Sequence, residues 1–235
     1  MTCFPSVLSG ANIGSPFEIQ SKNYICGPMN GNIAKTLYLV RHGETDPNKN
    51  HIIQGSGIDA PLNETGQRQA KDFYFAYRHI SFDKVYTSHL IRTHQSVRWF
   101  TEKGIPHDSL TDLREISWGE KDGTRIDPAE QRIYQAMLKD WQAGLLDRSF
   151  SGGESPYQVV ARMKTAMQTI MEREEEKTIL MCIHGRAMRI LLSMLMQTPL
   201  SEMEQYLHSN LCLYILEYDG QKWKICLEND TSHLL

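Results

Sequence analysis

Residues 37–48 read LYLVRHGETDPN, and this stretch decides the fold that the sequence predicts. Four apolar residues run directly into Arg41, His42 and Gly43. A short, wholly apolar run that ends in charge and glycine is typical of a buried parallel strand at its carboxyl end. Ligands bind at that edge of open α/β sheets, because the loops that leave the strands diverge there and form a crevice. We therefore expect His42 to lie at a strand tip, beside a ligand site.

A second copy of this arrangement lies much later in the chain. Residues 178–183 (TILMCI) form another apolar run, and His184 and Gly185 follow it before a helical pattern begins. A lone histidine is more often a hydrogen-bonded core or loop residue than a functional one. Two histidines in the same context, one of them beside an arginine, reverse that expectation. The sequence predicts that two strands bring His42 and His184 to one crevice.

The phrase R-H-G-x-T-x-x-N, from Arg41 to Asn48, resembles the signature of the histidine phosphatase superfamily, also called phosphoglycerate mutase-like. The resemblance covers roughly residue 36 to the C-terminus, and we assign it to the phosphatase branch. It implies a single catalytic domain over residues 36–235, with a three-layer α/β/α fold around a mainly parallel central sheet. Residues 1–35 are rich in Gly, Ser, Pro and Asn and are predicted to form an irregular N-terminal extension.

Apolar spacing places the elements of this fold. Apolar residues that recur every three to four positions predict helices over residues 65–78, 90–100, 128–141 and 156–175. The same spacing predicts a helix after His184 that stops before Pro199. Strands are predicted at residues 84–87 and at the end of residues 110–114. Two runs, 211–218 and 223–227, flank an Asp-Gly turn and predict a hairpin at an antiparallel edge of the sheet. Residues 116–153 are expected to supply a helical cap over the C-terminal ends of the strands.

Two segments are expected to face water. Residues 172–177 (EREEEK) read as the solvated end of a helix, because short mixed charge runs usually lie in solvent. The tail through Asp230 and His233 is expected to be a solvated chain end.

Composition and charge narrow the functional class. The net charge of −3 and the pI near 6.3 give no basic footprint for nucleic acid or anionic membranes. No run approaches the ~18 apolar residues of a membrane helix, and the start lacks a secretory signal pattern. Five dispersed cysteines without a C-x-x-C pair argue against a disulfide framework or a structural zinc site. We expect a cytoplasmic protein with no nucleic-acid or membrane partner, and the sequence leaves a homodimer open.

The resemblance also implies site residues outside the first motif. The phrase S-x-L-x-R-T-x-Q-S at residues 88–96 resembles the family's second phosphate-binding arginine motif and implies that role for Arg92. The phrase L-x-E-x-x-x-G at residues 113–119 resembles the proton-donor segment and implies that role for Glu115. Asn48, Gln54 and Gly55 match positions that line the phosphate or substrate in the family. Where many relatives have Trp-Glu-Gly, residues 121–123 read Lys-Asp-Gly, so the pocket wall departs from the family pattern.

These residue types suit the transfer of a phosphoryl group to a histidine. Only an uncharged imidazole has a lone pair for attack, and the neighbouring Arg41 disfavours the imidazolium. We predict that His42 is the nucleophile and forms a phosphohistidine, and that Glu115 protonates the leaving alkoxide. Arg41, Arg92 and His184 would hold the phosphate, with His184 working best when protonated. This chemistry needs no cofactor, and the chain has no metal-spaced signature such as H-E-x-x-H.

The leading prediction is a metal-independent phosphomonoesterase of the histidine acid phosphatase type, acting on a small phosphorylated metabolite. A cofactor-dependent phosphoglycerate mutase is the chief alternative. Mutases of that kind have a bulky, basic, proline-rich insertion after the acid segment, and residues 123–153 hold none, which favours hydrolysis. A non-catalytic binder of phosphorylated ligands is the second alternative, but it predicts the loss of a chemical group, whereas the four groups at His42, Arg92, Glu115 and His184 are all present. The sequence does not name the phosphoester.

Overall fold

Strand β1 (Lys35–Arg41) lies inside a six-stranded sheet of order β3-β2-β4-β1-β5-β6. The computed structural model describes residues 33–234. The predicted extension over residues 1–35 therefore falls outside the described residues up to residue 32, and β1 already begins at Lys35. β1 pairs in parallel with β4 (Thr178–Ile183), with Arg41 opposite Ile183. Because the two strands end level, the residues that follow them, His42 and His184, leave the sheet side by side.

The remaining strands complete a mixed sheet. β2 (Lys84–Thr87) and β3 (His107–Ser109) continue the parallel part beyond β4. β5 (Leu213–Tyr218) runs antiparallel to β1, and β6 (Trp223–Asp230) runs antiparallel to β5. The prediction of a mainly parallel sheet with an antiparallel hairpin at its edge is confirmed. The strand predicted to end in residues 110–114 lies earlier, at β3, and a 3-10 turn, η1 (Thr111–Leu113), takes its place.

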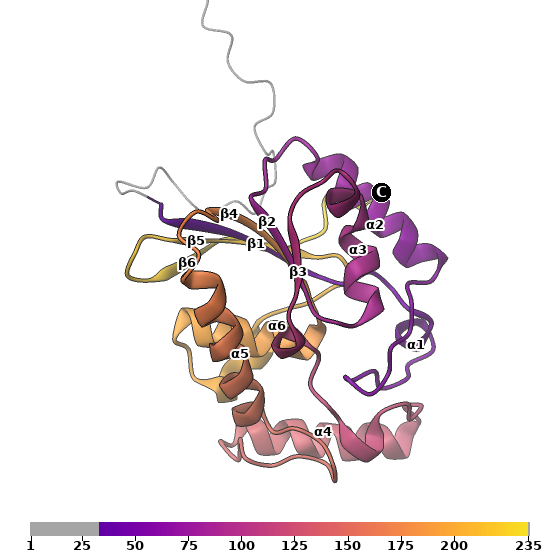
Figure 1. The fold of residues 1–235 in the computed structure, drawn as a ribbon. Coiled ribbons are helices and arrows are strands. Elements are labelled where there is room, and N and C mark those ends of the chain that lie inside the picture. Colours follow the sequence, from indigo (N-terminus) through magenta and orange to yellow (C-terminus); the bar gives the residue numbers. More distant parts are fainter. Residues whose placement is uncertain (1–32, 235) are drawn as a thin grey trace, which may run out of the picture.

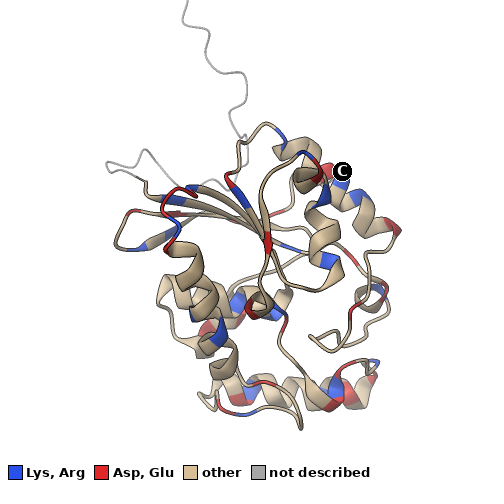
Figure 2. Cartoon of the chain, in the orientation of Figure 1, with Lys and Arg blue, Asp and Glu red and all other residues tan. Residues whose placement is uncertain are grey.

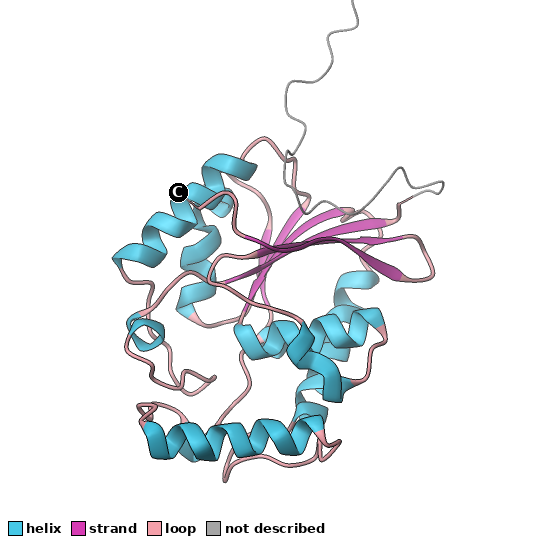
Figure 3. Cartoon of the chain, turned by 180° about the vertical axis from the view of Figure 1, so that it is seen from behind, coloured by secondary structure: helices cyan, strands magenta, loops and turns pink. Residues whose placement is uncertain are grey.

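Helices cover both faces of the sheet. α2 (Glu64–Tyr77) and α3 (Ile91–Glu102) lie on one side, whereas α5 (Pro156–Met171) and α6 (Gly185–Met196) lie on the other (Figures 1 and 3). Successive side chains of β1 point to opposite faces of the sheet and so contribute to two hydrophobic cores. Leu37 and Leu39 pack with α5 and α6, and Tyr38 and Val40 pack with α2 and α3. This two-sided burial explains why the strand is apolar along its whole length.

The predicted cap region contains a single long helix, α4 (Pro128–Gln142), which lies at a distance from the sheet (Figure 1). Asp127 caps its N-terminus by accepting the N–H groups of Ala129 and Glu130, and Pro128 occupies the first turn. Trp141 on α4 stacks on Trp118 with ring centroids 5.6 Å apart. Trp118 lies just before η2 (Gly119–Lys121), so the stack ties α4 to the segment that carries Glu115.

Two segments are less exposed than the sequence suggested. Helix α5 ends at Met171, and within residues 172–177 Glu176 is buried, where it accepts a hydrogen bond from the Tyr86 hydroxyl at 2.5 Å. Glu176 can be buried because β2 also brings the Lys84 ammonium within 3.9 Å of its carboxylate. At the C-terminus, the His233 ring packs against Phe73 and donates from Nε2 to the Leu211 carbonyl at 2.9 Å. The prediction that these two segments are wholly solvated was therefore wrong.

Charge is distributed over the whole molecule. Basic and acidic residues are interspersed along the helices and strands in Figure 2. Within residues 33–234, no helix combines the length and the apolar character that crossing a membrane requires.

Candidate active site

The two histidines predicted to share a crevice are neighbours. The imidazole centroids of His42 and His184 lie 5.2 Å apart, and both side chains are buried. His42 directly follows β1, and His184 is the N-cap residue of α6 directly after β4. The parallel pairing of these two strands is therefore the cause of the contact.

The hydrogen bond of His42 defines which nitrogen holds its proton. Nδ1 lies 2.7 Å from the Gly43 carbonyl oxygen, which can only accept, so Nδ1 carries the hydrogen. Burial, followed by the charges of Arg92 and Arg41, holds the pKa of His42 well below its usual range. The ring is neutral at physiological pH, and its lone pair is on Nε2. This is the form of imidazole that can act as a nucleophile.

The hydrogen bonds of His184 define which of its nitrogens can hold a proton. Its Nδ1 accepts a hydrogen bond from Arg92 Nε at 3.1 Å, so this nitrogen carries no proton, and Nε2 lies 2.8 Å from the Ser88 hydroxyl oxygen. Burial, with a further contribution from Arg92, keeps the pKa of His184 well below its usual range. The ring is therefore neutral, because a guanidinium faces the nitrogen that would take a proton. That His184 works best when protonated stays a prediction.

Arg92 is fully buried, although most arginines lie at the surface. It is in the first turn of α3, and Ser96 in the next turn donates to its carbonyl. Besides His184, its guanidinium donates to the carbonyls of Ile58, at 2.6 Å, and Gly55, at 3.3 Å. Burial lowers the pKa of Arg92 to about 10, so the group is still charged at neutral pH. Among residues 33–234, no carboxylate forms an ion pair with it.

Arg41 supplies the second guanidinium of the site, and its side chain is half-buried. Its Nη1 donates to the His208 carbonyl at 2.8 Å, and its Nε is buried without a hydrogen-bond partner in the described part of the chain. Burial lowers the pKa of Arg41 as well. Like Arg92, it makes no ion pair with any carboxylate of residues 33–234. The neutral His42 thus lies in the field of two cations that lack close counter-ions.

Glu115 is buried and accepts three backbone N–H groups. Oε1 accepts from Ile116 and Ala187, both at 2.9 Å, and Oε2 accepts from Arg186 at 3.1 Å. Arg186 and Ala187 are the second and third residues of α6. The carboxylate therefore takes the place of a capping side chain at a helix N-terminus, where negative charge is favoured. This contact holds Glu115 at the first turn of the helix that follows His184.

A cleft of about 230 Å³ opens over this cluster. Four predicted site residues line it, namely Arg41, Asn48, Gln54 and Glu115. The rest of its wall comprises Ile52, Ile53, Trp118, Ile126, Tyr134, Gly185, Arg186 and His208. The predicted site residues His42, Arg92 and His184 are not among the lining residues, but His42 and His184 directly precede or follow residues that are, Arg41 and Gly185.

Asn48 and Gln54 are fixed by the short loop that leaves β1. Asn48 and Thr45 form a reciprocal capping box at the start of α1 (Asp46–Lys49). The Gln54 carbonyl accepts from the Thr45 hydroxyl at 2.7 Å, which leaves the Gln54 amide nitrogen buried and without a partner among the described residues. A buried donor without an acceptor is costly, and a ligand oxygen could satisfy it.

Gly55 has a different environment from the one expected. Its N–H donates to Asp122 at 2.8 Å, and its carbonyl accepts from Arg92, so it orients Arg92 and is not among the residues that line the cleft. A Cβ at this position would lie 2.2 Å from Asp122 Oδ1 and 2.6 Å from the Ile116 carbonyl, so only glycine fits. Asp122 belongs to the Lys-Asp-Gly phrase in which the chain departs from the family pattern. The departure supplies the acceptor that holds the loop.

Comparison with known proteins agrees with this geometry. The model of the histidine phosphatase superfamily (branch 1) matches residues 37–231, which include every site residue above. The chain belongs to the histidine phosphatase superfamily.

Individual members of this superfamily match over most of the chain. The "Uncharacterized phosphatase PhoE" of Bacillus subtilis (strain 168) is 30% identical over 201 residues, which cover 83% of this chain and 95% of that protein. "Phosphoglycerate mutase-like protein 4" of Arabidopsis thaliana is 30% identical over 202 residues, covering 84% and 86%. The structure of Bacillus stearothermophilus YhfR superposes with a TM-score of 0.76 at 30% identity, covering 86% of this chain and all of that one. These likenesses support an enzyme that acts on phosphate esters.

Three residues of this histidine phosphatase site were missed by the sequence reasoning. His208 contacts Arg41, Asn210 donates to the His42 carbonyl at 3.1 Å and to Asn48, and Arg186 lines the cleft. His208 and Asn210 lie in the loop before β5, far in sequence from any motif. Arg186 stands two residues after His184, but its side chain gives no periodic or motif signal.

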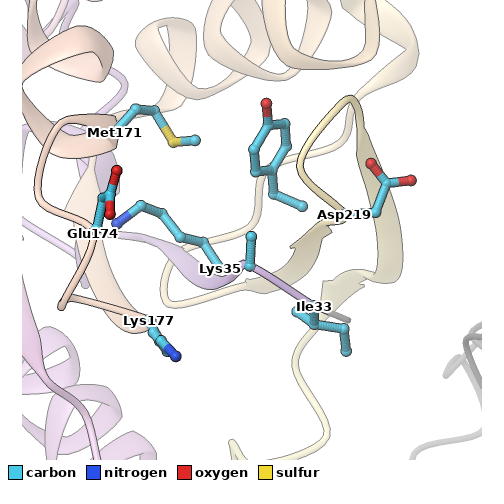
Figure 4. A pocket seen from close by; sticks show the side chains of 8 residues that line it. Ile33, Lys35, Met171, Glu174, Lys177 and Asp219 are labelled. Atoms are coloured by element: carbon cyan, nitrogen blue, oxygen red, sulfur yellow. The ribbon is translucent and has the colours of Figure 1, made fainter. Parts of the chain in front are cut away.

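A larger hollow lies at the opposite ends of the strands, away from this site. It measures about 730 Å³ and lies where β1 begins, between the C-terminal end of α5 and the end of β5 (Figure 4). Its charged groups come from Lys35, Glu174, Lys177 and Asp219 (Figure 4). It contains none of the predicted site residues, and it borders residue 33, where the described chain starts. The smaller cleft is the candidate active site because Arg41, Asn48, Gln54 and Glu115 line it, and His42 and His184 are neighbours in the chain of lining residues.

Proposed function

We propose that the protein is a phosphomonoesterase that acts on a small phosphorylated metabolite through a phosphohistidine at His42. The observation that carries this proposal is the neutral His42, with its lone pair on Nε2, beside the buried Arg92 and the half-buried Arg41, neither of which forms an ion pair with a carboxylate of residues 33–234. Uncompensated buried cations are costly unless an anion joins them. A phosphate dianion would supply that charge within reach of the nucleophile.

The reaction would proceed in two displacements. His42 Nε2 attacks phosphorus, the ester P–O bond breaks, and the leaving oxygen takes a proton from Glu115. Water then attacks the phosphohistidine, returns a proton to Glu115 and breaks the P–N bond to release phosphate. The Arg41 and Arg92 guanidiniums would stabilise the charge on the phosphoryl oxygens. A bound dianion would also favour a proton on His184, so the expected imidazolium would form only with substrate present.

The size of the cleft supports a small substrate. Its volume of about 230 Å³ lies below the ~300–1,000 Å³ that is usual for pockets binding drug-sized ligands. The phosphoester of a compact metabolite suits this space better than a phosphorylated protein segment.

The test is direct detection of the intermediate. After a brief acid-free quench with a phosphomonoester, intact-mass and peptide analysis should find one phosphoryl group on His42. The variant His42→Ala should lose at least about 1,000-fold in turnover, because no other group can replace the nucleophile. The control His94→Ala changes a histidine outside the site and should stay within about threefold. A never-modified His42 with full turnover would refute the proposal.

A phosphoglycerate mutase is the second candidate, because a relative with a mutase-like name matches as well as the phosphatase-named one. The two activities share the intermediate but differ in its fate. Phosphatase activity predicts one phosphate released for each ester consumed, with or without a bisphosphorylated primer, and no loss of rate in EDTA. Ester isomerisation without phosphate release, dependent on the primer, would assign the mutase instead.

A further inference from the structure

Arg186 is a buried arginine in the wall of the candidate active-site cleft. It is the second residue of α6, it is 6% exposed, and it lines the same cleft as Glu115. Its backbone N–H donates to Glu115 Oε2 at 3.1 Å. If Glu115 protonates the leaving oxygen, the part of the substrate beyond that oxygen lies beside Arg186.

The guanidinium of Arg186 is held in one orientation. It lies 5.9 Å from the ring centroid of Trp118 and 5.6 Å from that of Trp141. Nη2 donates to the Tyr134 hydroxyl at 3.3 Å, and Nη1 forms an ion pair with Glu204. Stacking on aromatic rings and a fixed ion pair pre-organise the group, so binding an anion would cost little side-chain entropy.

The cluster around Arg186 has one positive charge in excess. The Glu204 carboxylate is shared, with one oxygen paired to Arg186 and the other to Arg189. Within residues 33–234, no other carboxylate forms an ion pair with either arginine. The Nε–H of Arg186 is also buried without a hydrogen-bond partner in the described chain. A buried donor without an acceptor is a binding group for an anion.

The other charged residues that line the cleft also leave an excess of positive charge. Arg41 and Arg186 contribute two cations, whereas the one lining carboxylate, Glu115, already accepts three N–H groups. One phosphate ester would occupy the neighbourhood of Arg41 and His42. A second anionic group on the same molecule would be needed to satisfy Arg186.

We propose that Arg186 is a specificity-determining residue that selects phosphomonoesters carrying a carboxylate on the leaving-group side, an inference that rests on the proposed phosphatase function. A planar carboxylate fits the fork of a guanidinium, and the small cleft favours it over a bulkier anion. The substrate class is therefore a phosphorylated hydroxy acid or hydroxy amino acid of a few carbons.

Matched substrates test this without any mutation. 3-Phosphoglycerate and glycerol 3-phosphate differ by the carboxylate, as do O-phosphoserine and O-phosphoethanolamine. In each pair the wild-type enzyme should show a kcat/KM at least about tenfold higher for the carboxylate-bearing ester. A ratio near one in both pairs would overturn the inference and leave the phosphatase function intact.

Variants then assign the preference to one residue. Arg186→Met should bring both ratios close to one, whereas Arg189→Met, which changes the other partner of Glu204, should leave them within twofold of wild type. In either variant the remaining arginine still pairs with Glu204, so no carboxylate is left alone. An unchanged ratio in Arg186→Met, or an equal loss in Arg189→Met, would contradict the assignment. If Arg186→Met does not fold, Arg186→Lys should lower the ratios in part, because an ammonium lacks the planar fork.

Failure of the proposed function gives a different result. If the wild-type protein releases no phosphate from any of the four esters, calorimetry with 3-phosphoglycerate and glycerol 3-phosphate decides the inference. At least about tenfold tighter binding of 3-phosphoglycerate, lost in Arg186→Met, would support carboxylate selection by Arg186 in a binding protein. Equal binding of the two esters would reject it.

Discussion

At the scale of single residues, the site depends on which groups are kept neutral. His42 lacks a charge because it is buried near two arginines, and the Gly43 carbonyl holds its one proton on Nδ1. The arginines remain charged because even a depressed guanidinium pKa, about 10 for Arg92, lies above physiological pH. A neutral imidazole and two charged guanidiniums therefore lie together, and neither guanidinium forms an ion pair with a carboxylate of residues 33–234.

Glu115→Gln tests the proton donor. We expect the loss in kcat to be about 100-fold or more for an alkyl phosphate, whose leaving oxygen needs a proton, and far smaller for 4-nitrophenyl phosphate. The amide oxygen can still accept N–H groups of α6, but the amide nitrogen cannot, so thermal unfolding of the variant should be recorded alongside. Equal losses on both substrates, in a folded variant, would remove Glu115 from this role.

Some residues were predictable and others were not. Arg41, His42, Arg92, Glu115 and His184 stand in short motifs, so their proximity could be anticipated. The neutral state of His184 could not, because it results from the Arg92 Nε–H at its ring, a contact across 92 residues. Their catalytic roles are still predictions.

At the scale of elements, α6 links the two chemical ends of the site. Its N-cap is His184, its first-turn N–H groups hold Glu115, and Arg186 stands in the same turn. α5 supports this arrangement through Arg162, which donates to both oxygens of Glu154 and to the carbonyls of Asp112, Arg114 and Glu115. One buried guanidinium thus braces the segment that positions Glu115, the proposed proton donor.

Arg162→Met tests this bracing. The substitution leaves three carbonyls without a donor and weakens the pairing of Glu154, so we expect the free energy of unfolding to fall by about 2–4 kcal/mol. Lys164→Met changes an exposed residue of the same helix and should cost less than about 0.5 kcal/mol. Urea unfolding monitored by circular dichroism measures both values. A cost for Arg162→Met no greater than the control would show that the bracing is dispensable.

Element positions were easier to predict than element ends. β4 was predicted with the bounds that it has, because Thr178–Ile183 is uniformly apolar between charged and glycine-containing segments. The end of α5 was placed four residues too late, since the acidic run that follows it has helical propensity. Tertiary contacts of Glu176 with Tyr86 compete with that propensity.

At the scale of the whole molecule, buried neutral histidines couple the site to acid stability. Burial and nearby arginines keep the pKa values of His42 and His184 well below the usual range. An unfolded histidine takes up a proton below about pH 6.5, so in acid the unfolded state binds more protons than the folded one. Stability is therefore complete above about pH 6.5 and is lost as the pH falls below it.

We expect the free energy of unfolding to drop between pH 6.5 and 5 by up to about 1.4 kcal/mol per pH unit for each of these histidines. His42→Asn removes the titrating group but keeps an N–H for the Gly43 carbonyl, so its slope should be shallower by about that amount. His89→Asn changes an exposed histidine and should keep the wild-type slope. Urea titrations at three pH values give the slopes, and identical slopes in all three proteins would contradict the coupling.

The amino-acid sequence by itself determined the sheet, the helices that cover it and the family, because apolar period and short motifs are local properties that survive without coordinates. The tertiary structure alone decided the protonation of His184, the use of Glu115 as a helix cap, the role of Gly55 in holding Arg92 and the place of Arg186 in the cleft wall. Each of these depends on which distant groups are buried together, and burial decides which charges and hydrogen bonds remain for a ligand.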